Sequence, residues 1–456
     1  MTRDRTGTGD VHVPGRVGVS PGPPNVIEDA FRERASRDGQ RSVRDAQTGG
    51  RDAHPTRELS LAERLRIVRE LRHLIAENAD ALAAAAAAVS DRPLAEKLVS
   101  EVLPLADACR WLEKNAARVL APRRHGKRGR PFWMTGVSFE IQRQPFGTVL
   151  VIGPGNYPLF IPAVHALHAL VAGNAVLLKP APGTREVALT FASLACAAGL
   201  DPALLTILPE SVEAARDAIA AGVDKVVFTG SSENGREVLA QLAVTNTPSV
   251  MELSGKDAVL VFADADLDLV VRALRFGTRL NGGETCIAPR RLVVVQSIAE
   301  DLLDRLATAR GPRLLIERVR DDTAAVLRAN AADFALGASI FSRDIATARA
   351  LAAQIKTGFV LINELIVPTA DPRMPFGGVR ASGFGTTRGD EGLLEMTHPH
   401  VVAIRRGRRH PHLDDPAPDD AHLFTAYLRA AHGRSRLAAI PAFLRALIAK
   451  SKPTKS

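Results

Sequence analysis

The stretch TVLVIGPGNYPLF, residues 148–160, joins a short apolar run to a loop that contains two glycines and two prolines. TVLVI is rich in β-branched residues, as buried strands are, and residues 159–172 after the loop have a helical pattern. The same alternation continues with three further pairs of strand and helix: AVLLKP (175–180) and 184–198, LLTILP (204–209) and 211–221, KVVFTG (225–230) and 234–243. Short apolar strands that alternate with helices predict an α/β fold whose parallel sheet is covered on both faces.

The segments before this core differ in composition. Residues 1–25 are rich in Gly, Pro, Arg and Thr without periodicity, which predicts a disordered tail. The pattern from residue 26 to 120 is helical, with apolar residues three and four apart in LSLAERLRIVRELRHLIAENADALAAAAAAV. Ser60, followed three residues later by Glu63, predicts a capping box at the start of that helix.

Bulk properties exclude several classes of protein. Three cysteines in 456 residues cannot build a disulfide framework, which favours a reducing, cytoplasmic compartment. The chain shows neither a secretory signal pattern nor an apolar run of about 18 residues that would span a membrane. The net charge of +9 is concentrated in short basic runs without a recognition module, and aromatic residues make up 4% of the chain. We therefore expect no nucleic-acid partner.

Three loops follow predicted strands at the edge where ligands bind in open parallel sheets: GPGNYP (153–158), KPAPGT (179–184) and FTGSSENG (228–235). The third loop opens a helix with Gly230 and Gly235, and its backbone N–H groups could face a pyrophosphate. It is neither a P-loop, because Arg236 and Glu237 stand at the Lys and Ser/Thr positions, nor a GxGxxG loop. Alone, it is more often a simple turn.

Two further stretches contain residues suited to catalysis. NGGETCIAPRR (281–291) places Cys286 on a loop rich in glycine, and MELSGK (251–256) places Glu252 at a predicted strand end. A thiol and a carboxylate could act as nucleophile and general base. Each residue taken singly is more often structural, Cys286 as a small core residue and Glu252 as a polar group at a strand end.

Asn156, Lys179, Gly230, Glu252 and Cys286 together match the aldehyde dehydrogenase family in order and approximate spacing. The resemblance spans roughly residues 27–406 and is carried by seven segments in the family's order: QRQPFGTVLVIGPGNYPL, GNAVLLKPA, VVFTGS, MELSGK, the NGGETC-x-AP-RR loop, GFVLIN and MPFGGVRASGFG. It implies a Rossmann-like parallel-sheet cofactor domain, an αβ catalytic domain and a small β oligomerisation element.

The resemblance also implies a mechanism. The Cys286 thiolate would attack an aldehyde, and the Asn156 amide and the Cys286 N–H would stabilise the oxyanion of the thiohemiacetal. Hydride transfer to the cofactor would leave a thioester, which water activated by Glu252 would hydrolyse to the acid. The residues that match the family's binding segments for NAD or NADP are Ile152, Gly153, Pro154, Lys179, Gly230, Ser231, Gly235 and Leu253.

The ionisation of Cys286 needs help from its surroundings. The preceding segment LDLVVRALRFGTRL (267–280) is an amphipathic helix pattern, so Cys286 lies beyond a helix C-terminus. The helix dipole disfavours a thiolate there. We expect Cys286 to be much less reactive when no dinucleotide is bound.

Two positions depart from the family's pattern. Pro182 stands where many NAD-using relatives have a Glu that holds the 2′-hydroxyl, so NADP is admissible. The family's Glu-x-Phe-Gly-Pro segment, whose Glu holds the nicotinamide ribose, is missing from a shortened catalytic domain. The local counterpart is Gly311-Pro312, with Thr308 and Arg310 at the Glu and Phe positions, and Glu317 is a candidate substitute.

This shortening leaves three functions open. The first is oxidation of an aldehyde to an acid, the second a catalytically impaired homologue that serves as a binding or scaffold subunit. The third is an acylating dehydrogenase, in which coenzyme A accepts the acyl group, although Glu252 favours water as the acceptor. We expect an NAD(P)-binding domain at 26–135 and 148–252, a catalytic domain at 253–390, and an oligomerisation element at 136–147 and 391–406 that makes a homodimer or homotetramer.

The C-terminal extension, residues 407–456, has a composition of its own. No acidic residue occurs from Ala421 to Ser456, and six apolar residues fall on one predicted helical face: Leu437, Ile440, Phe443, Leu444, Leu447 and Ile448. This pattern resembles a helix at a membrane interface, and it occurs more often in a helix packed on the protein's own body or on a partner subunit. A lipid-bound tail would favour a lipophilic aldehyde as substrate. His165 and His168 lie three apart without further ligands, so we expect a packing role and no metal.

Overall fold

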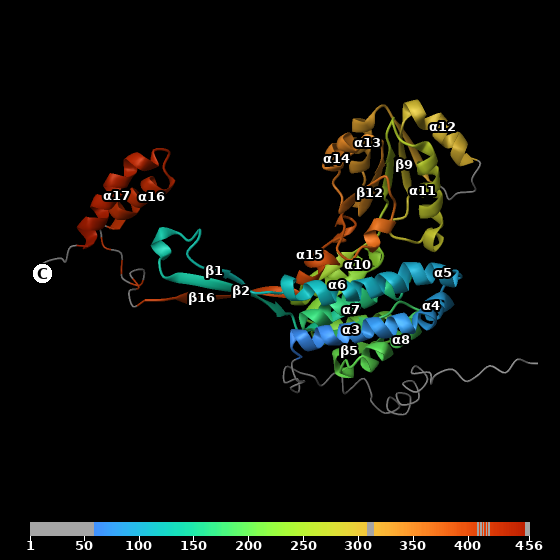
Figure 1. Cartoon of the computed structure of the whole chain (residues 1–456), viewed down its shortest axis with the longest axis horizontal. Helices are drawn as coiled ribbons and strands as arrows, with labels where there is room; N and C mark the ends of the chain where they lie inside the picture. Colours follow the sequence, from blue (N-terminus) through green and yellow to red (C-terminus); the bar gives the residue numbers. More distant parts are fainter. Residues whose placement is uncertain are drawn as a thin grey trace, which may run out of the picture. The chain divides into compact units, whose positions relative to one another are not determined.

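The computed structural model describes residues 59–307, 314–407 and 420–451, together with positions 410, 413, 415 and 417 (Figure 1). The tail predicted to be disordered, residues 1–25, lies outside the described residues. The chain divides into two compact units. The first comprises Met1–Arg123 and Ile141–Val401, and the second comprises Arg124–Glu140 and Val402–Ser456.

The first unit begins with a group of helices: α3 (Leu61–Glu77), α4 (Ala79–Ala88), α5 (Leu94–Lys97), a π-helical turn (Leu98–Val102) and α6 (Leu103–Val119). The predicted capping box is confirmed at the start of α3. The Glu63 N–H donates to the Ser60 hydroxyl over 3.3 Å, and the Ser60 N–H donates to the Glu63 carboxylate over 2.8 Å. These two bonds satisfy backbone donors that the first turn of a helix leaves without partners.

The predicted parallel sheet is confirmed. Its strand order is β15-β7-β6-β3-β4-β5, and the parallel strands are β3 (Thr148–Ile152), β4 (Ala175–Lys179), β5 (Leu205–Ile207), β6 (Lys225–Thr229) and β7 (Ser249–Glu252). The connecting helices are α7 (Phe160–Ala172), α8 (Arg185–Ala197), α9 (Val212–Ala221) and α10 (Ser232–Thr245). The edge strand β15 (Gly383–Phe384) comes from much later in the chain and runs antiparallel to β7.

Alternate side chains of each strand face opposite helical layers. Val149 and Val151 pack on the side of α3, α6, α7 and α8, which Figure 1 shows stacked together. Leu150 and Ile152 face the other way, against α9 and α10. Each such side chain stabilises the fold by about 1.5–3 kcal/mol when fully buried. Burial on both faces explains why these strands are apolar throughout instead of alternating.

A second parallel sheet follows, with strand order β10-β9-β8-β12-β13. Its strands are β8 (Ala258–Val261), β9 (Arg291–Val295), β10 (Leu315–Val319), β12 (Gly337–Phe341) and β13 (Phe359–Ile362). Helices α11 (Leu267–Arg279) and α12 (Gln296–Ala307) cover one face, and α13 (Asp322–Asn330) and α14 (Ile345–Ala352) cover the other (Figure 1). The short strand β11 (Phe334–Ala335) lies between α13 and β12 and pairs with β14 (Val379–Arg380), and the short helix α15 (Gly389–Leu394) follows later in the chain.

A three-stranded sheet has the order β1-β2-β16, formed by β1 (Arg123–His125), β2 (Val137–Pro145) and β16 (Thr397–Arg405). The strands predicted around 136–147 and 399–406 are therefore present as neighbours in one sheet. The second unit ends in two helices, α16 (Asp420–His432) and α17 (Arg436–Ser451), which pack against each other. Among the described residues, no helix is both long and apolar enough to span a membrane.

Candidate active site

The loop after β3 and the loop before β9 are joined by side-chain hydrogen bonds. Nδ2 of Asn156 donates to the Glu284 carbonyl over 2.7 Å, and Nδ2 of Asn281 donates to the Asn156 carbonyl over 2.7 Å. The Tyr157 hydroxyl lies 2.7 Å from Oγ1 of Thr285. The predicted oxyanion donor is thus bonded into the loop that carries the predicted nucleophile. The amide of Asn156 keeps a second N–H, because Nδ2 carries two.

The backbone conformation ahead of Cys286 explains why the residues there are Asn, Gly and Gly. Helix α11 ends at Arg279, and the chain then reverses through a 3-10 turn (Leu280–Gly283) in which φ is 50° at Asn281, 63° at Gly282 and 77° at Gly283. Left-handed conformations of this kind are accessible to Gly and Asn and are strained for most other residues. The turn places Cys286 after the helix C-terminus, as the sequence predicts.

Cys286 is partly exposed at the edge of the core that covers the second sheet. Burial raises the pKa of the Cys286 thiol to about 12, and the negative charges of Glu252 and Asp257 act in the same direction. Arg388 and the Ile287 N–H oppose the rise in this pKa. The thiol is therefore protonated at neutral pH, and its activation requires a further positive charge or a base.

Glu252 is the last residue of β7, and its side chain is buried. The Thr387 hydroxyl donates to one carboxylate oxygen, and the Thr229 hydroxyl donates to the other over 3.4 Å. Burial raises the pKa of Glu252, while Thr387, Arg388 and Thr229 act against that rise. A carboxylate whose pKa is raised, and which acts electrostatically on a neighbouring thiol, is a stronger base than an ordinary carboxylate and is suited to accepting a proton.

The glycine-rich segment around β15 completes the surroundings of Glu252. Gly383 pairs with Glu252, and the Leu253 N–H donates to the Ser382 carbonyl over 3.1 Å. A Cβ atom on Gly383 would lie 1.8 Å from the Met251 carbonyl oxygen, so this close approach of two backbones admits only glycine. The sequence identifies MPFGGVRASGFG as a family segment, but its contact with Glu252 emerges only from the fold.

Arg388 is a buried cation that sequence reasoning missed. Its guanidinium lies 4.3 Å from the centre of the Phe376 ring and donates to the Thr369 carbonyl. Burial lowers the pKa of Arg388, and the negative charges of Glu252 and Cys286 raise it. Arg388 therefore favours the thiolate form of Cys286. Arg388 follows Thr387 in a segment without a recognisable motif, so the sequence does not reveal that it acts on Cys286 and Glu252.

The Asn156 loop is also anchored from the N-terminal helices. One oxygen of Glu101 accepts the N–H groups of Leu159 and Phe160 over 2.7 and 3.2 Å, where α7 begins. The other oxygen accepts from Nζ of Lys97 over 3.0 Å, and both side chains are fully buried. Burial raises the pKa of Glu101, and the charge of Lys97 and the N–H groups of Leu159 and Phe160 oppose that rise.

The same helical segment anchors the cysteine loop. Oε1 of Glu96 accepts the backbone N–H of Asn281 over 2.8 Å. Glu96 belongs to α5, and Glu101 belongs to the π-helical turn that follows it. Such turns frequently occur at functional sites. The Lys97–Glu101 spacing of four residues suggests an ion pair, but an ordinary surface pair has the same spacing, so the sequence does not reveal its burial.

Lys179 ends β4 and is largely buried, and no hydrogen bond or ion pair joins its amine to another described residue. Burial lowers its pKa, and Glu210 opposes this effect. A largely buried amine without a protein partner fits a ligand hydroxyl or phosphate. The Gly153 N–H, by contrast, donates to the Lys179 carbonyl over 2.9 Å and holds β3 to β4.

The predicted cofactor glycines serve packing as well. A Cβ atom on Gly235 would lie 2.5 Å from Leu253, and one on Gly230 would lie 2.7 Å from the Phe228 ring. Ser231 caps α10, because its hydroxyl accepts the Asn234 N–H over 3.2 Å. The end of β6 and the start of α10 thus approach β7 closely, with free N–H groups in the first helical turn. This arrangement fits a pyrophosphate at the helix N-terminus.

Glu317 is not placed to hold the nicotinamide ribose, the role for which the sequence made it a candidate. This residue lies in β10, where it bonds to Arg291 over 2.7 Å and also pairs with Arg328. Both ion pairs lower its pKa against the effect of burial. Glu317 therefore stabilises the edge of the second sheet and is not available to hold a ribose. Thr308, Arg310 and Gly311-Pro312 lie outside the described residues.

His165 and His168 are buried in α7, where burial lowers their pKa values to about 3 and about 4. His168 bonds to the Val164 carbonyl over 2.8 Å and stacks on Trp111 with ring centres 6.0 Å apart. These neutral rings pack the core. In the part of the chain that the structure describes, no three His, Cys, Asp or Glu side chains are placed to bind a metal.

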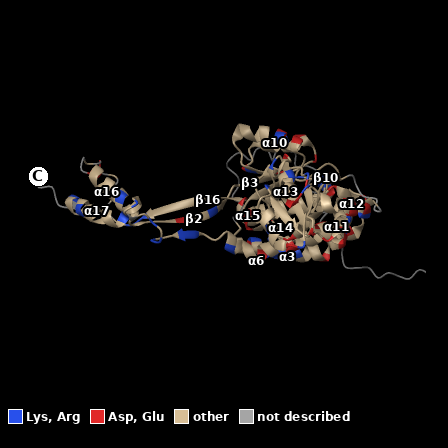
Figure 2. Cartoon of the chain, turned by 90° about the horizontal axis from the view of Figure 1, so that it is seen from above, with Lys and Arg blue, Asp and Glu red and all other residues tan. Residues whose placement is uncertain are grey.

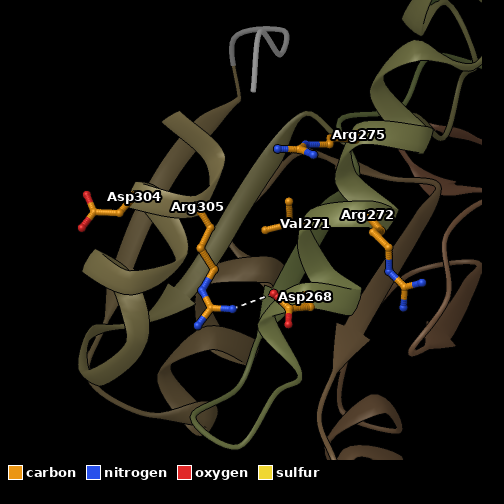
Figure 3. Close-up of a pocket in the computed structure, with 6 residues that line it drawn as sticks. All are labelled: Asp268, Val271, Arg272, Arg275, Asp304 and Arg305. Carbon is orange, nitrogen blue, oxygen red and sulfur yellow. Dashed lines mark hydrogen bonds and ion pairs between the residues drawn. The ribbon is translucent and has the colours of Figure 1, made fainter. Parts of the chain in front are cut away.

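Two hollows lie on the surface of the first unit. One, of about 610 Å³, lies between α11 and α12, where Arg305 reaches across to Asp268 (Figure 3). None of the predicted site residues lines it. The other, of about 480 Å³, is lined by the segment around Gly377, Gly383 and Thr386, beside the strand that covers Glu252. No predicted catalytic or cofactor residue lines the second hollow either, although its wall includes β15, which pairs with β7 at Glu252.

Comparison with known proteins identifies the class. The model of the aldehyde dehydrogenase family matches residues 27–310 and 308–402, in two parts that meet at the shortened segment. A 4,4'-diapolycopene aldehyde oxidase from Methylomonas sp. is 30% identical over 422 residues, which cover 77% of this chain and 79% of the relative. A putative succinate-semialdehyde dehydrogenase [NADP(+)] from Mycolicibacterium smegmatis is 26% identical over 76% of this chain and 81% of its own length.

A solved structure agrees with the sequence comparisons. The NAD-dependent aldehyde dehydrogenase from Sinorhizobium meliloti superposes with a TM-score of 0.73 at 25% identity, over 85% of this chain and 89% of that one. The chain belongs to the aldehyde dehydrogenase family. It is an aldehyde-oxidising enzyme that uses NAD or NADP, as the sequence predicts.

Proposed function

We propose that the chain oxidises an aldehyde to a carboxylic acid through a covalent thioester on Cys286. The observation that carries this proposal is the tie between two loops: Asn156 bonds the cysteine loop directly, and Glu252 influences the Cys286 thiol electrostatically. Nucleophile, oxyanion donor and base come from three separate segments of the chain. Their convergence supports the acyl-transfer chemistry that covalent catalysis requires.

The residues divide the reaction between them. Cys286 loses its proton to Glu252 or to solvent and attacks the aldehyde carbonyl carbon. The free N–H of Asn156 and the Cys286 N–H stabilise the resulting oxyanion. Lys179 would hold the ribose of NAD or NADP and the first turn of α10 its pyrophosphate; the cofactor would supply the acceptor for the hydride that leaves the adduct on Cys286, which gives the thioester. Glu252 then takes a proton from water, which hydrolyses the thioester and frees the thiol.

We propose a lipophilic aldehyde as substrate. The Methylomonas relative is named for 4,4'-diapolycopene aldehyde, and it matches this chain over most of both lengths. Pro182 stands after the cofactor lysine, so no carboxylate at that position repels a 2′-phosphate. Both dinucleotides are therefore expected to work. We further propose that strand β16, which has exposed Val401 and Ile404 at a sheet edge, pairs with a second copy to form the oligomer.

The test combines purified protein with each dinucleotide and a panel of short polar, branched and long-chain aldehydes. Absorbance of the reduced cofactor measures turnover, and calorimetry measures dinucleotide binding. We expect turnover with the highest kcat/KM for long apolar aldehydes, and none in a Cys286→Ala variant. Dinucleotide binding without turnover of any aldehyde would overturn the proposed oxidation and favour an impaired subunit. Turnover that requires coenzyme A would overturn hydrolysis by Glu252.

A further inference from the structure

The second unit ends in a helical hairpin, residues 420–451, whose inner face is made of small and aromatic side chains. Ala426 of α16 and Ala446 of α17 are buried, and the rings of Tyr427 and Phe443 lie 5.5 Å apart. An ion pair between Lys450 and Asp420 closes the open end. Phe443, predicted to share the apolar face of α17, therefore points toward the other helix.

The large aliphatic side chains of α17 point away from α16. Leu437, Ile440, Leu444 and Ile448 are 83%, 40%, 48% and 58% exposed, and Leu447 is exposed as well. Their spacing of three and four residues places them on one stripe of the helix. A folded unit normally buries such a stripe, but none of the described residues of the second unit covers the apolar surface of α17.

Positive charge surrounds this stripe. Arg436 and Arg445 flank it on the two sides of α17, and Asp420 is the last acidic residue of the chain. The segments of the second unit hold fifteen Lys and Arg and five Asp and Glu, so they account for all of the chain's net charge of +9 and leave the rest at −1. Figure 2 shows basic residues along α16, α17 and the strands of the same unit.

We propose that the hairpin docks on an anionic lipid bilayer, with the α17 stripe inserted among the acyl chains near the headgroups. Leucine and isoleucine at this depth bury apolar area, and the flanking arginines reach phosphate groups. The charge decides against a second copy of the hairpin as the occupant, because a symmetric contact would bring like charges together. The sequence from Ala421 to Ser456 offers no acidic residue to neutralise them.

Docking places the enzyme beside lipid-dissolved compounds. It goes beyond the proposed oxidation and does not depend on it, because binding is measured without substrate. The family match ends at residue 402, so the hairpin lies outside the region shared with the family. Membrane attachment is thus a property of this chain's own extension.

The experiment is cosedimentation of the full chain with vesicles of phosphatidylcholine, alone or with 30% phosphatidylserine. We expect at least tenfold stronger partitioning to the anionic vesicles and a marked loss at high salt. Leu437→Asp with Leu444→Asp should reduce binding at least tenfold. Arg436→Glu with Arg445→Glu should remove the preference for anionic lipid. Leu327→Asp, at an exposed leucine on α13, is the matched control and should bind like the original chain.

Circular dichroism and light scattering accompany each variant. Equal partitioning of the original chain and the Leu437→Asp, Leu444→Asp variant would overturn the proposal. Absence of vesicle binding, with a smaller oligomer in that variant, would overturn it too and assign the stripe to a second copy. Binding that does not distinguish neutral from anionic vesicles would overturn the electrostatic part.

Discussion

Two buried clusters in the first unit contain ionisable groups, and they are organised in opposite ways. In the N-terminal helices, Lys97 and Glu101 form an ion pair over 3.0 Å, and two backbone N–H groups donate to the other carboxylate oxygen of Glu101. Around Cys286, by contrast, Glu252 has only hydroxyl donors, and Arg388 interacts at longer range. Burial raises the pKa of the carboxylate in both clusters, but one cluster pairs its charges directly, and the other leaves a thiol and a carboxylate without a direct ion pair.

This difference indicates a structural role for the Lys97–Glu101 cluster and a catalytic role for the cluster around Cys286. A paired buried charge has no reason to exchange protons, but breaking the pair is costly, so it suits a structural anchor. A carboxylate without a direct ion pair and with a raised pKa accepts a proton more readily than a paired one, and groups of this kind gather at functional sites. The anchor holds the start of α7, next to the Asn156 loop, while Glu96 holds the cysteine loop. The paired cluster thus positions the unpaired one.

Removal of the nucleophile should have the largest effect. Cys286→Ala should lower aldehyde oxidation by a factor of about 10⁴ or more, because no other group can form the covalent intermediate. Formation of reduced cofactor measures the loss. Cys196→Ala, on α8 and away from both loops, is the matched control and should retain activity. Substantial activity in Cys286→Ala would contradict covalent catalysis at this position.

Loss of the base should come next. Glu252→Gln should lower steady-state turnover by about 10²–10⁴, the contribution expected of a general base. Stopped-flow absorbance should still show a burst of reduced cofactor, because hydride transfer precedes hydrolysis. If the burst disappears together with turnover, Glu252 acts at the attack of Cys286 and not at water. In the original chain, the raised pKa of Glu252 should make turnover fall with decreasing pH at values above its usual range.

Breaking the anchor should destabilise the fold and the site together. Glu101→Gln leaves the Lys97 cation buried without a charge partner and should cost about 3–5 kcal/mol in free energy of unfolding. Urea unfolding measures this cost, and kcat should fall as the Asn156 loop loosens. Asp390→Asn breaks the exposed pair with Arg118 and should cost about 0–1 kcal/mol. An equal loss in free energy of unfolding for the two variants would show that the buried Lys97–Glu101 pair stabilises the fold no more than an exposed pair.

The last prediction concerns the alkylation rate of Cys286 and the influence of Arg388 on it. Because the thiol pKa is about 12 in the cofactor-free chain, the rate should rise about tenfold per pH unit between pH 7 and 10. Arg388→Met should slow alkylation at each pH, since it removes a positive charge that favours the thiolate. Mass spectrometry of the Cys286 peptide measures the rate. Added NAD should accelerate alkylation, and equal rates with and without NAD would show that the cofactor does not activate the Cys286 thiol.

Much of the fold could be predicted because its signals are local. The apolar strands from Thr148 to Glu252 and the Ser60 capping box appear in the structure where the pattern places them. The candidate site residues were predicted from the resemblance to the aldehyde dehydrogenase family, because the matching segments occur in the family's order. Arg388, Thr387 and Glu101 were missed, because each lies in a segment without a motif and reaches the site only through packing.

The sequence by itself determined the family, the alternation of strands and helices, and the residue types for covalent aldehyde oxidation, because these depend on local periodicity and on matching segments. Only the tertiary structure decided which charges are paired and which are left perturbed. It gave Glu317 to Arg291 instead of a ribose, turned Phe443 inward and exposed the α17 stripe. Burial and ion pairing depend on contacts between distant segments, and the spacing of residues along the chain does not contain that information.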